Sequence, residues 1–229
     1  MKFARTAIVL AAALGAGSAM AQDIQFSGGL KAWNHSFDIN AANRLGSSSD
    51  SSNFNTTSTL LSVTARKGEY FLTYSMLLPS TYALNTGDIK RQDSDIAVGW
   101  NFMPGYSVLV GQKVIKSKVY DLDLQSWNNS STSTDKGAFI ALTGAQSLKD
   151  KFFAYESIAY APKLKSSPET NSSIKFTTLE VGLGYALDNK TQLTIGVRNQ
   201  KYDLSDPSRG NYNQMVKLNG LIFGASYNF

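Results

Sequence analysis

Catalytic chemistry on this chain would have to start at its single histidine, His35. Histidine is the usual general base beside a serine nucleophile, and the two side chains must lie within hydrogen-bond reach. Ser36 is the adjacent residue, and Asp38 lies three positions further along. Because alternate side chains of an extended strand point to opposite faces, His35 faces away from both. The spacing provides no nucleophile–base pair, so we expect no enzyme and no catalytic residue; a lipid-modifying enzyme or protease that depends on His35 is the least favoured alternative.

Metal and cofactor chemistry has equally little support in the sequence. Asp121 and Asp123 have an Asp-x-Asp spacing, but the further ligands and turn glycine of a calcium loop are missing, so they are expected to be solvated carboxylates. The chain has no cysteine and no phosphate-binding glycine motif. We predict no metal site and no cofactor, and small secreted folds held by disulfides are excluded.

Charged residues inside apolar, alternating segments indicate a second kind of chemistry, the ion pair. A tight turn at residues 103–105 would place Asp95 opposite Lys113, and a turn at residues 188–190 would place Glu180 opposite Arg198. Opposite charges directly across two strands reinforce the register that placed them. Both ion pairs follow from the register that sends all apolar side chains of the hairpin to one face.

The same reasoning predicts apolar cross-strand pairs, because a slip of one residue would move every apolar side chain to the wrong face. A third hairpin is expected around Lys67-Gly68. The predicted outer pairs are Phe102 with Tyr106, Trp100 with Val108, Val98 with Val110, Leu187 with Thr191, Tyr185 with Leu193, Leu183 with Ile195, Val181 with Val197, Ala65 with Tyr70, Val63 with Leu72 and Leu61 with Tyr74.

The elements that carry these residues are short alternating segments with two kinds of connection. Turn signals divide residues 22–229 into ten strands, and an error over one hairpin would give eight or twelve. Long polar connections are predicted at residues 39–55, 79–92, 117–136, 162–173 and 203–212, and tight turns at 67–68, 103–105, 149–150 and 188–190. A soluble β-sandwich is the alternative, but it lacks this rhythm of long and short connections, which is typical of outer-membrane barrels.

The last segment alternates between an apolar face and a face of small, mostly polar groups, and it ends on an aromatic residue. Leu221, Phe223, Tyr227 and Phe229 share the apolar face. This pattern resembles the closing strand of small Gram-negative outer-membrane β-barrels of the OmpX-, opacity- and small-porin-like class. In that class the C-terminal strand is the signal read by the assembly machinery, so the resemblance implies outer-membrane localisation, with periplasmic chaperones and the barrel-assembly machinery as partners.

The N-terminus agrees with export. Lys2 and Arg5 precede a short apolar run at residues 7–17, and residues 18–21 provide an Ala-x-Ala cleavage site. The run is too short for a membrane-spanning helix. We therefore expect residues 1–21 to be a cleaved signal peptide and residues 22–229 to form one domain. Its formal charge falls from +5 to +3 once Lys2 and Arg5 are removed, which does not indicate nucleic-acid binding.

An exported membrane protein without a spanning helix must close its sheet, because lipid leaves no partner for backbone groups at a free edge. The predicted fold is therefore an all-β, transmembrane, antiparallel up-and-down barrel, expected to be monomeric. Lys31 and Glu156 should also face the lumen, where three cations would oppose three carboxylates. Two roles remain open for this set, a structural network that fills the lumen and a mixed-sign constriction of a narrow pore.

Outward-facing residues complete the predictions. Aromatic residues beside the tight turns are expected to form an aromatic girdle, with a place in a core as the alternative. Lys217 points outward above the apolar stretch, where it either meets phosphates of outer-membrane lipid and lipopolysaccharide or is simply solvated. The expected girdle consists of Tyr70, Phe102, Tyr106, Tyr227 and Phe229.

Overall fold

The computed structural model describes residues 24–43, 46–51, 56–84, 87–119, 132–167, 172–206 and 212–229. The predicted signal peptide, residues 1–21, lies outside the described residues, and so do Asp121 and Asp123. No helix among the described residues is long and apolar enough to cross a membrane.

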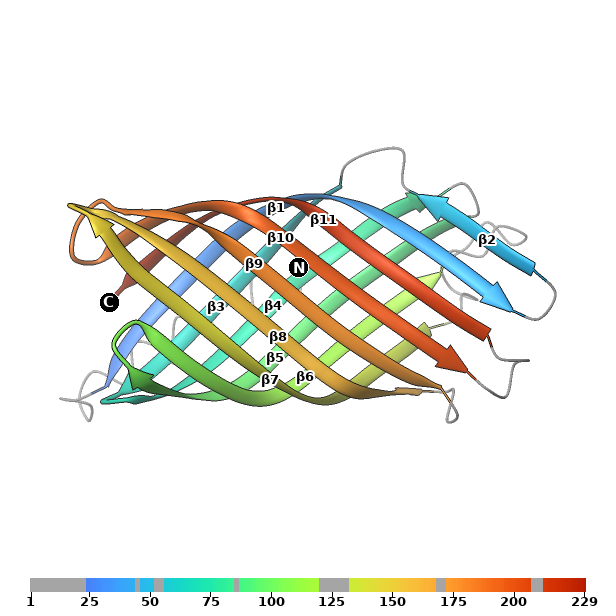
Figure 1. Cartoon of the computed structure of the whole chain (residues 1–229), viewed down its shortest axis with the longest axis horizontal. Helices are drawn as coiled ribbons and strands as arrows, with labels where there is room; N and C mark the ends of the chain where they lie inside the picture. The colour runs from blue at the N-terminus through green and yellow to red at the C-terminus, as the bar shows by residue number, and fades with distance from the viewer. Residues whose placement is uncertain are drawn as a thin grey trace, which may run out of the picture.

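Ten antiparallel strands form a closed barrel in which each strand pairs with its neighbours in the sequence and the last pairs with the first (Figure 1). This is the predicted up-and-down barrel, and closure excludes the two-sheet sandwich. The strands of the ring are β1 (Gln25–Asn43), β3 (Thr56–Lys67), β4 (Tyr70–Leu84), β5 (Gly87–Met103), β6 (Tyr106–Val119), β7 (Thr132–Lys149), β8 (Phe152–Ser167), β9 (Ser173–Ala186), β10 (Thr191–Asp206) and β11 (Tyr212–Asn228).

A further short strand, β2 (Gly46–Ser51), pairs with the end of β1 and lies outside the ring. Much of the sequence predicted to be loop is strand, so the barrel wall is longer than expected at that end. The clearest case is the connection predicted at residues 79–92, where β4 and β5 leave only residues 85–86 between them. Polar composition marks exposure to water and does not distinguish a loop from a strand that extends beyond a membrane.

The four tight turns are found where the sequence predicts them. Gly68 and Gly105 have positive φ values of 60° and 80°, which glycine adopts without strain. Asp188 accepts hydrogen bonds from the backbone N–H groups of Lys190 and Thr191, at 2.8 and 2.6 Å. These two bonds stabilise the carboxylate, and they hold the pKa of Asp188 below its ordinary value.

The register is confirmed in two hairpins and differs in detail in two places. Trp100 pairs with Val108, and Val181 pairs with Val197, as predicted. In the first hairpin Ala65 pairs with Leu72 rather than Tyr70, because the turn contains only two residues. The register differs from the predicted one by two residues, so each side chain remains on its predicted face. At the second turn Tyr106 pairs with Met103 rather than Phe102, because a bulge interrupts the ladder between Asn101 and Met103.

Large apolar side chains project outward around the whole ring, as expected of a surface in contact with lipid. We call this set the apolar band. Its exposed members include Leu30, Leu72, Val98, Val110, Ile140, Ile158, Leu183, Ile195 and Leu221.

A second apolar set is buried inside the barrel, toward the end opposite the tight turns. Its largest completely buried members are Trp33, Tyr82 and Phe176, which belong to β1, β4 and β9. Aliphatic side chains from β6, β8, β9 and β11 pack with them and fill the lumen at this level. They are Ile115, Leu164, Ile174, Leu218 and Ile222.

Candidate functional site in the barrel lumen

Glu180 of β9 holds two cations at the level where the lumen begins to close. Its carboxylate accepts hydrogen bonds from Lys31 Nζ at 2.5 Å and from Arg198 Nη1 at 2.9 Å. Glu180 and Arg198 are direct partners in the β9–β10 ladder, as predicted, whereas Lys31 reaches Glu180 from β1 across the lumen. The Glu180 side chain is 4% exposed and that of Lys31 is 34% exposed, so this cluster is open to water on one side.

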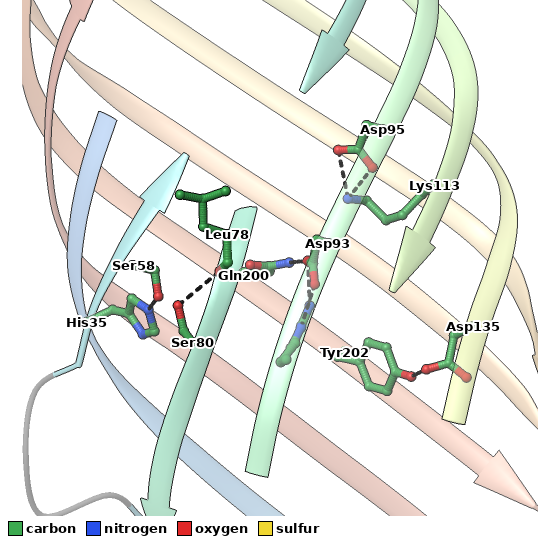
Figure 2. A network of polar contacts seen from close by, with 11 residues as sticks. His35, Ser58, Leu78, Ser80, Asp93, Asp95, Lys113, Asp135, Gln200 and Tyr202 are labelled. Carbon is green, nitrogen blue, oxygen red and sulfur yellow. Dashed lines mark hydrogen bonds and ion pairs between the residues drawn. The ribbon is translucent and has the colours of Figure 1, made fainter. Parts of the chain in front are cut away.

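Asp95 and Lys113 form a second ion pair, between β5 and β6. They are direct ladder partners, and the Lys113 ammonium lies 2.8 Å from one carboxylate oxygen of Asp95 and 2.7 Å from the other (Figure 2). The structure thus brings together both pairs predicted from the sequence. Lys113 is almost completely buried, which makes the paired carboxylate essential for keeping its charge inside.

A third charged cluster was not predicted. The Arg91 guanidinium donates two hydrogen bonds of 2.8 Å to Asp93, the bidentate geometry that favours arginine over lysine. Gln200 of β10 donates to the same carboxylate at 3.1 Å, and Tyr202 donates to Asp135 nearby (Figure 2). Arg91 falls within the loop predicted at residues 79–92. The signal for its true place was the parity that Arg91 shares with Asp93 and Asp95, which puts all three on one face of a strand.

Each lumen cation also lies over an aromatic ring, which partly replaces its lost hydration. Lys31 lies 5.3 Å from the ring centre of Tyr155, and Lys113 lies 4.3 Å from that of Phe176. The remaining two contacts are Arg91 over Tyr202 at 5.6 Å and Arg198 over Trp33 at 5.2 Å.

His35 belongs to a buried chain of rings and has a serine partner that the sequence did not reveal. Its Nε2 lies 2.9 Å from Ser58 Oγ of β3, and its Nδ1 lies 3.1 Å from the Ser36 carbonyl oxygen. Trp33 and Tyr82 cover the imidazole, with ring centres 4.0 and 5.5 Å away. His35 and Ser58 are each 1% exposed, so no substrate reaches this serine–histidine pair in the structure.

Two cavities meet at the Glu180 cluster. A vestibule of about 1050 Å³ opens at the tight-turn end, and it is lined by turn residues such as Pro104 and Gly105 and by polar wall residues such as Asn101. A smaller cavity of about 150 Å³ lies between Trp33, Asp93, Asp95 and Lys113. Lys31 and Arg198 border both cavities. The polar path therefore has a wide entrance and ends against the buried apolar set.

Glu156 does not belong to the lumen network, so the expectation that it faces inward is wrong. It pairs with Gly144 and Val181 in the two ladders of β8, and Val181 belongs to the outer face. Strand parity decides its direction, because Ile158 and Tyr160 must point outward from the same strand. Its carboxylate lies against Gly144 together with the ring of Tyr106.

The five residues of the expected girdle lie beside the tight turns or at the chain end, with Tyr70 and Phe229 more than 60% exposed. Tyr106 is half-buried because its ring covers Gly144. Tyr227 and Phe229 contact each other edge to face, with ring centres 5.2 Å apart. Leu221 and Phe223 continue the same exposed face of β11, so the expected assembly signal is presented on the outside of the barrel.

No protein-family model matches the sequence, and no curated protein matches it at a significant level. Among solved structures, the chain is similar to the outer membrane protease OmpT from Escherichia coli, with 11% identity, a TM-score of 0.57 and coverage of 92% of this chain and 98% of that chain. Neisserial surface protein A matches with 12% identity, a TM-score of 0.39 and coverage of 89% and 97%. The P. putida toluene transporter TodX matches with 8% identity, a TM-score of 0.38 and coverage of 93% and 92%.

The closed ring, the apolar outer face and the likeness to OmpT define the class: a small outer-membrane β-barrel. At 11% identity the likeness concerns the fold alone. One fold can support unrelated functions, so the class does not specify an activity.

Proposed function

We propose that this protein is an integral outer-membrane barrel of a Gram-negative bacterium that does not conduct solutes, and that its role is structural or lies in contacts made by its outer end. The observation that carries the proposal is the apolar cluster in the lumen, whose members Trp33, Tyr82, Leu164, Ile174 and Leu218 are completely buried. Such packing favours a lumen without a continuous water path, because protein interiors fill space as densely as organic crystals.

The charged residues support the same proposal. Asp93 and Asp95 each pair with one cation, and Glu180 is shared by Lys31 and Arg198, so three of the four positive charges in these clusters are neutralised by a carboxylate within them. Selective pores use rings of charge that remain available to the permeating ion. The arrangement is typical of a polar network that stabilises a small barrel from inside.

Conductance of the purified full-length barrel in planar bilayers tests the proposal. We expect no channel steps from the wild-type protein, and openings from a variant whose plug is thinned by Trp33→Ser and Tyr82→Ser. Both proteins must first show the faster unheated migration of a folded barrel in a denaturing gel. Steady openings of the wild-type protein, with an ion selectivity altered by Arg198→Glu, would overturn the proposal.

A narrow gated pore is the second candidate, and the vestibule favours it. The entrance of about 1050 Å³ leads directly to Lys31, Glu180 and Arg198, beyond which the smaller polar cavity continues. Movement of the apolar plug would join this path to the opposite end. The Arg198→Glu selectivity measurement above supports this candidate if wild-type openings occur.

An enzymatic role depends on His35 and is the weakest candidate. Ser58 and His35 have the separation of a nucleophile and its base, but both lie outside the two lumen cavities and both are enclosed. Hydrogen bonding between two buried side chains beneath Trp33 and Tyr82 is fully explained by packing.

A further inference from the structure

Lysines mark the border of the apolar band on most of the ring. On each strand from β5 to β11, the first charged side chain that faces outward beyond the band is a lysine. Polar residues such as Gln92 and Asn199 separate some of these lysines from the band, and on β6 Lys116 directly follows the outward Val114. The seven residues are Lys90, Lys116, Lys136, Lys163, Lys175, Lys201 and Lys217.

On β5 to β8, two of these lysines lie directly opposite a further lysine on the next strand. Lys90 is the direct partner of Lys118, and Lys136 is the direct partner of Lys165. Like charges directly opposite destabilise a sheet unless an anion lies between them. We call Lys90, Lys116, Lys118, Lys136 and Lys165 the lysine patch.

The lysine patch has little acidic compensation within the described part of the barrel. Asp88 is the one described carboxylate on the outer face of β5 to β8 beyond the apolar band, and no ion pair joins it to a lysine. Asp93 and Asp135 belong to the same strands but point into the lumen, where both are buried. Among the described residues, the patch therefore has an excess of positive charge on its outer surface.

In the neighbouring sector, formed by β9 to β11, carboxylates of the protein lie beside the lysines. Lys201 and Lys217 are also direct partners, but Lys201 Nζ lies 2.9 Å from Asp203, and the ladder places Lys217 directly opposite Asp38 of β1. Lys175 is the direct partner of the same Asp203. Carboxylates thus lie beside the lysines of β9 to β11, whereas the lysines of the patch have no such ladder partner among the described residues of β5 to β8.

We infer that the lysine patch binds the phosphate groups of lipopolysaccharide in the outer leaflet. Its place beyond the apolar band is the level of lipid headgroups, and long lysine side chains reach phosphates there while their stems cover apolar surface. Lysine pairs recognise phosphate as point charges, and an ion between two ammonium groups removes their repulsion. Acyl chains of the same lipid would contact Val110, Val114 and Ile140 below the patch.

The inference rests on the proposed outer-membrane location and is independent of the closed lumen. A conducting barrel could bind lipopolysaccharide, and a silent barrel could fail to bind it. The conductance and binding experiments therefore fail separately.

The test is a titration of the purified full-length barrel in detergent with bisphosphorylated lipid A, followed by native mass spectrometry. The patch variant carries Lys90→Gln, Lys118→Gln, Lys136→Gln and Lys165→Gln. The control carries three substitutions on β9 to β11, Lys175→Gln, Lys201→Gln and Lys217→Gln. We expect the patch variant to bind about tenfold more weakly than wild type, and the control to bind within about threefold of it. Dephosphorylated lipid A should bind wild type as weakly as bisphosphorylated lipid A binds the patch variant.

Three results would overturn the inference. They are equal binding by wild type and the patch variant, equal binding of the two lipid A forms, and an equally large loss in the control, which would indicate general charge attraction. Excess inorganic phosphate should leave lipid A bound, because inorganic phosphate lacks the acyl chains that contact the apolar band. Full displacement of lipid A by phosphate would identify a free-anion site instead. If the fourfold variant does not fold, Lys118→Gln with Lys136→Gln removes one member of each opposed pair and serves the same comparison.

Discussion

Glu180 is the residue on which the charge balance of the lumen depends. It accepts hydrogen bonds inside the lumen from Lys31 of β1 and from Arg198 of the neighbouring strand β10. Arg198 is also held over Trp33, so the carboxylate links the vestibule to the buried aromatic set. A single side chain therefore joins β1, β9 and β10 through the lumen in addition to their ladders.

Glu180→Gln should destabilise the barrel by about 2–4 kcal/mol, because it leaves two cations near one another without a counter-charge. The lower half of this range reflects the partial exposure of Lys31 to the vestibule, where water screens its charge. Urea unfolding in lipid vesicles measures the loss. Glu69→Gln is the control: Glu69 accepts a 3.3 Å bond from Trp100 at the exposed rim, and its loss should cost less than about 0.5 kcal/mol. Equal effects of the two changes would contradict the role given to Glu180.

The element that completes the barrel is the seam between β1 and β11. The ladder runs from Ser27 opposite Asn228 to Ala42 opposite Asn213 without a break in register. Phe229 continues it with a backbone bond of 2.9 Å to Phe26. A closed ladder removes the two free edges that an open sheet would present to lipid.

Gly220→Ala should destabilise this seam by about 3 kcal/mol or more. A Cβ atom on Gly220 would lie 1.8 Å from the Asn34 carbonyl oxygen and 2.5 Å from the His35 Cα, so the backbone of β1 would have to move. Gly28→Ala is the matched control on the same seam, since its nearest neighbour would be the Phe229 ring at 3.6 Å. The midpoints of urea unfolding of both variants decide the prediction. A Gly220→Ala barrel as stable as Gly28→Ala would show that the seam is looser than the structure indicates.

At the scale of the whole molecule, the barrel has two unlike halves. The half near the tight turns has an apolar exterior and a vestibule of about 1050 Å³ inside. The other half has polar and basic residues outside and a dense apolar and aromatic filling inside. Figure 1 shows the strands running through both halves without a break, so one ladder supports a membrane anchor and an outer portion.

Phe229→Ala should reduce assembly in cells more than it reduces stability. The ring is 63% exposed and contacts Tyr227, so truncation should cost about 1 kcal/mol in the purified, refolded barrel. If the C-terminal strand is the assembly signal, the fraction of folded barrel in membranes should fall several-fold, as measured by heat-dependent gel migration. Tyr70→Ala is the control, with 62% exposure beside an internal turn. Equal losses of folded barrel for the two variants would refute the signal.

The alternation of residues along the chain was sufficient to predict which side chains share a strand face and which residues form two of the ion pairs. A period of two, read against tight turns, determines which side chains share a face, and it placed Asp95 opposite Lys113 and Glu180 opposite Arg198. It did not give the direction of Glu156. The cost of a carboxylate near lipid favoured an inward side chain, whereas Glu156 has the same parity as the outward-facing Ile158 and Tyr160. The alternation also failed for Arg91, which falls within the loop predicted at residues 79–92, because its polar surroundings resemble a loop.

The sequence by itself determined the barrel class, the turns and the alternation, because these follow from local chain geometry and from the need to satisfy backbone groups in lipid. Only the tertiary structure decided which inward residues meet across the lumen. Lys31 and Glu180 are 149 positions apart, and Tyr202 and Asp135 are 67 apart. Neither contact follows from a single hairpin, because strand tilt and shear set the relative heights of distant strands only when the ring closes.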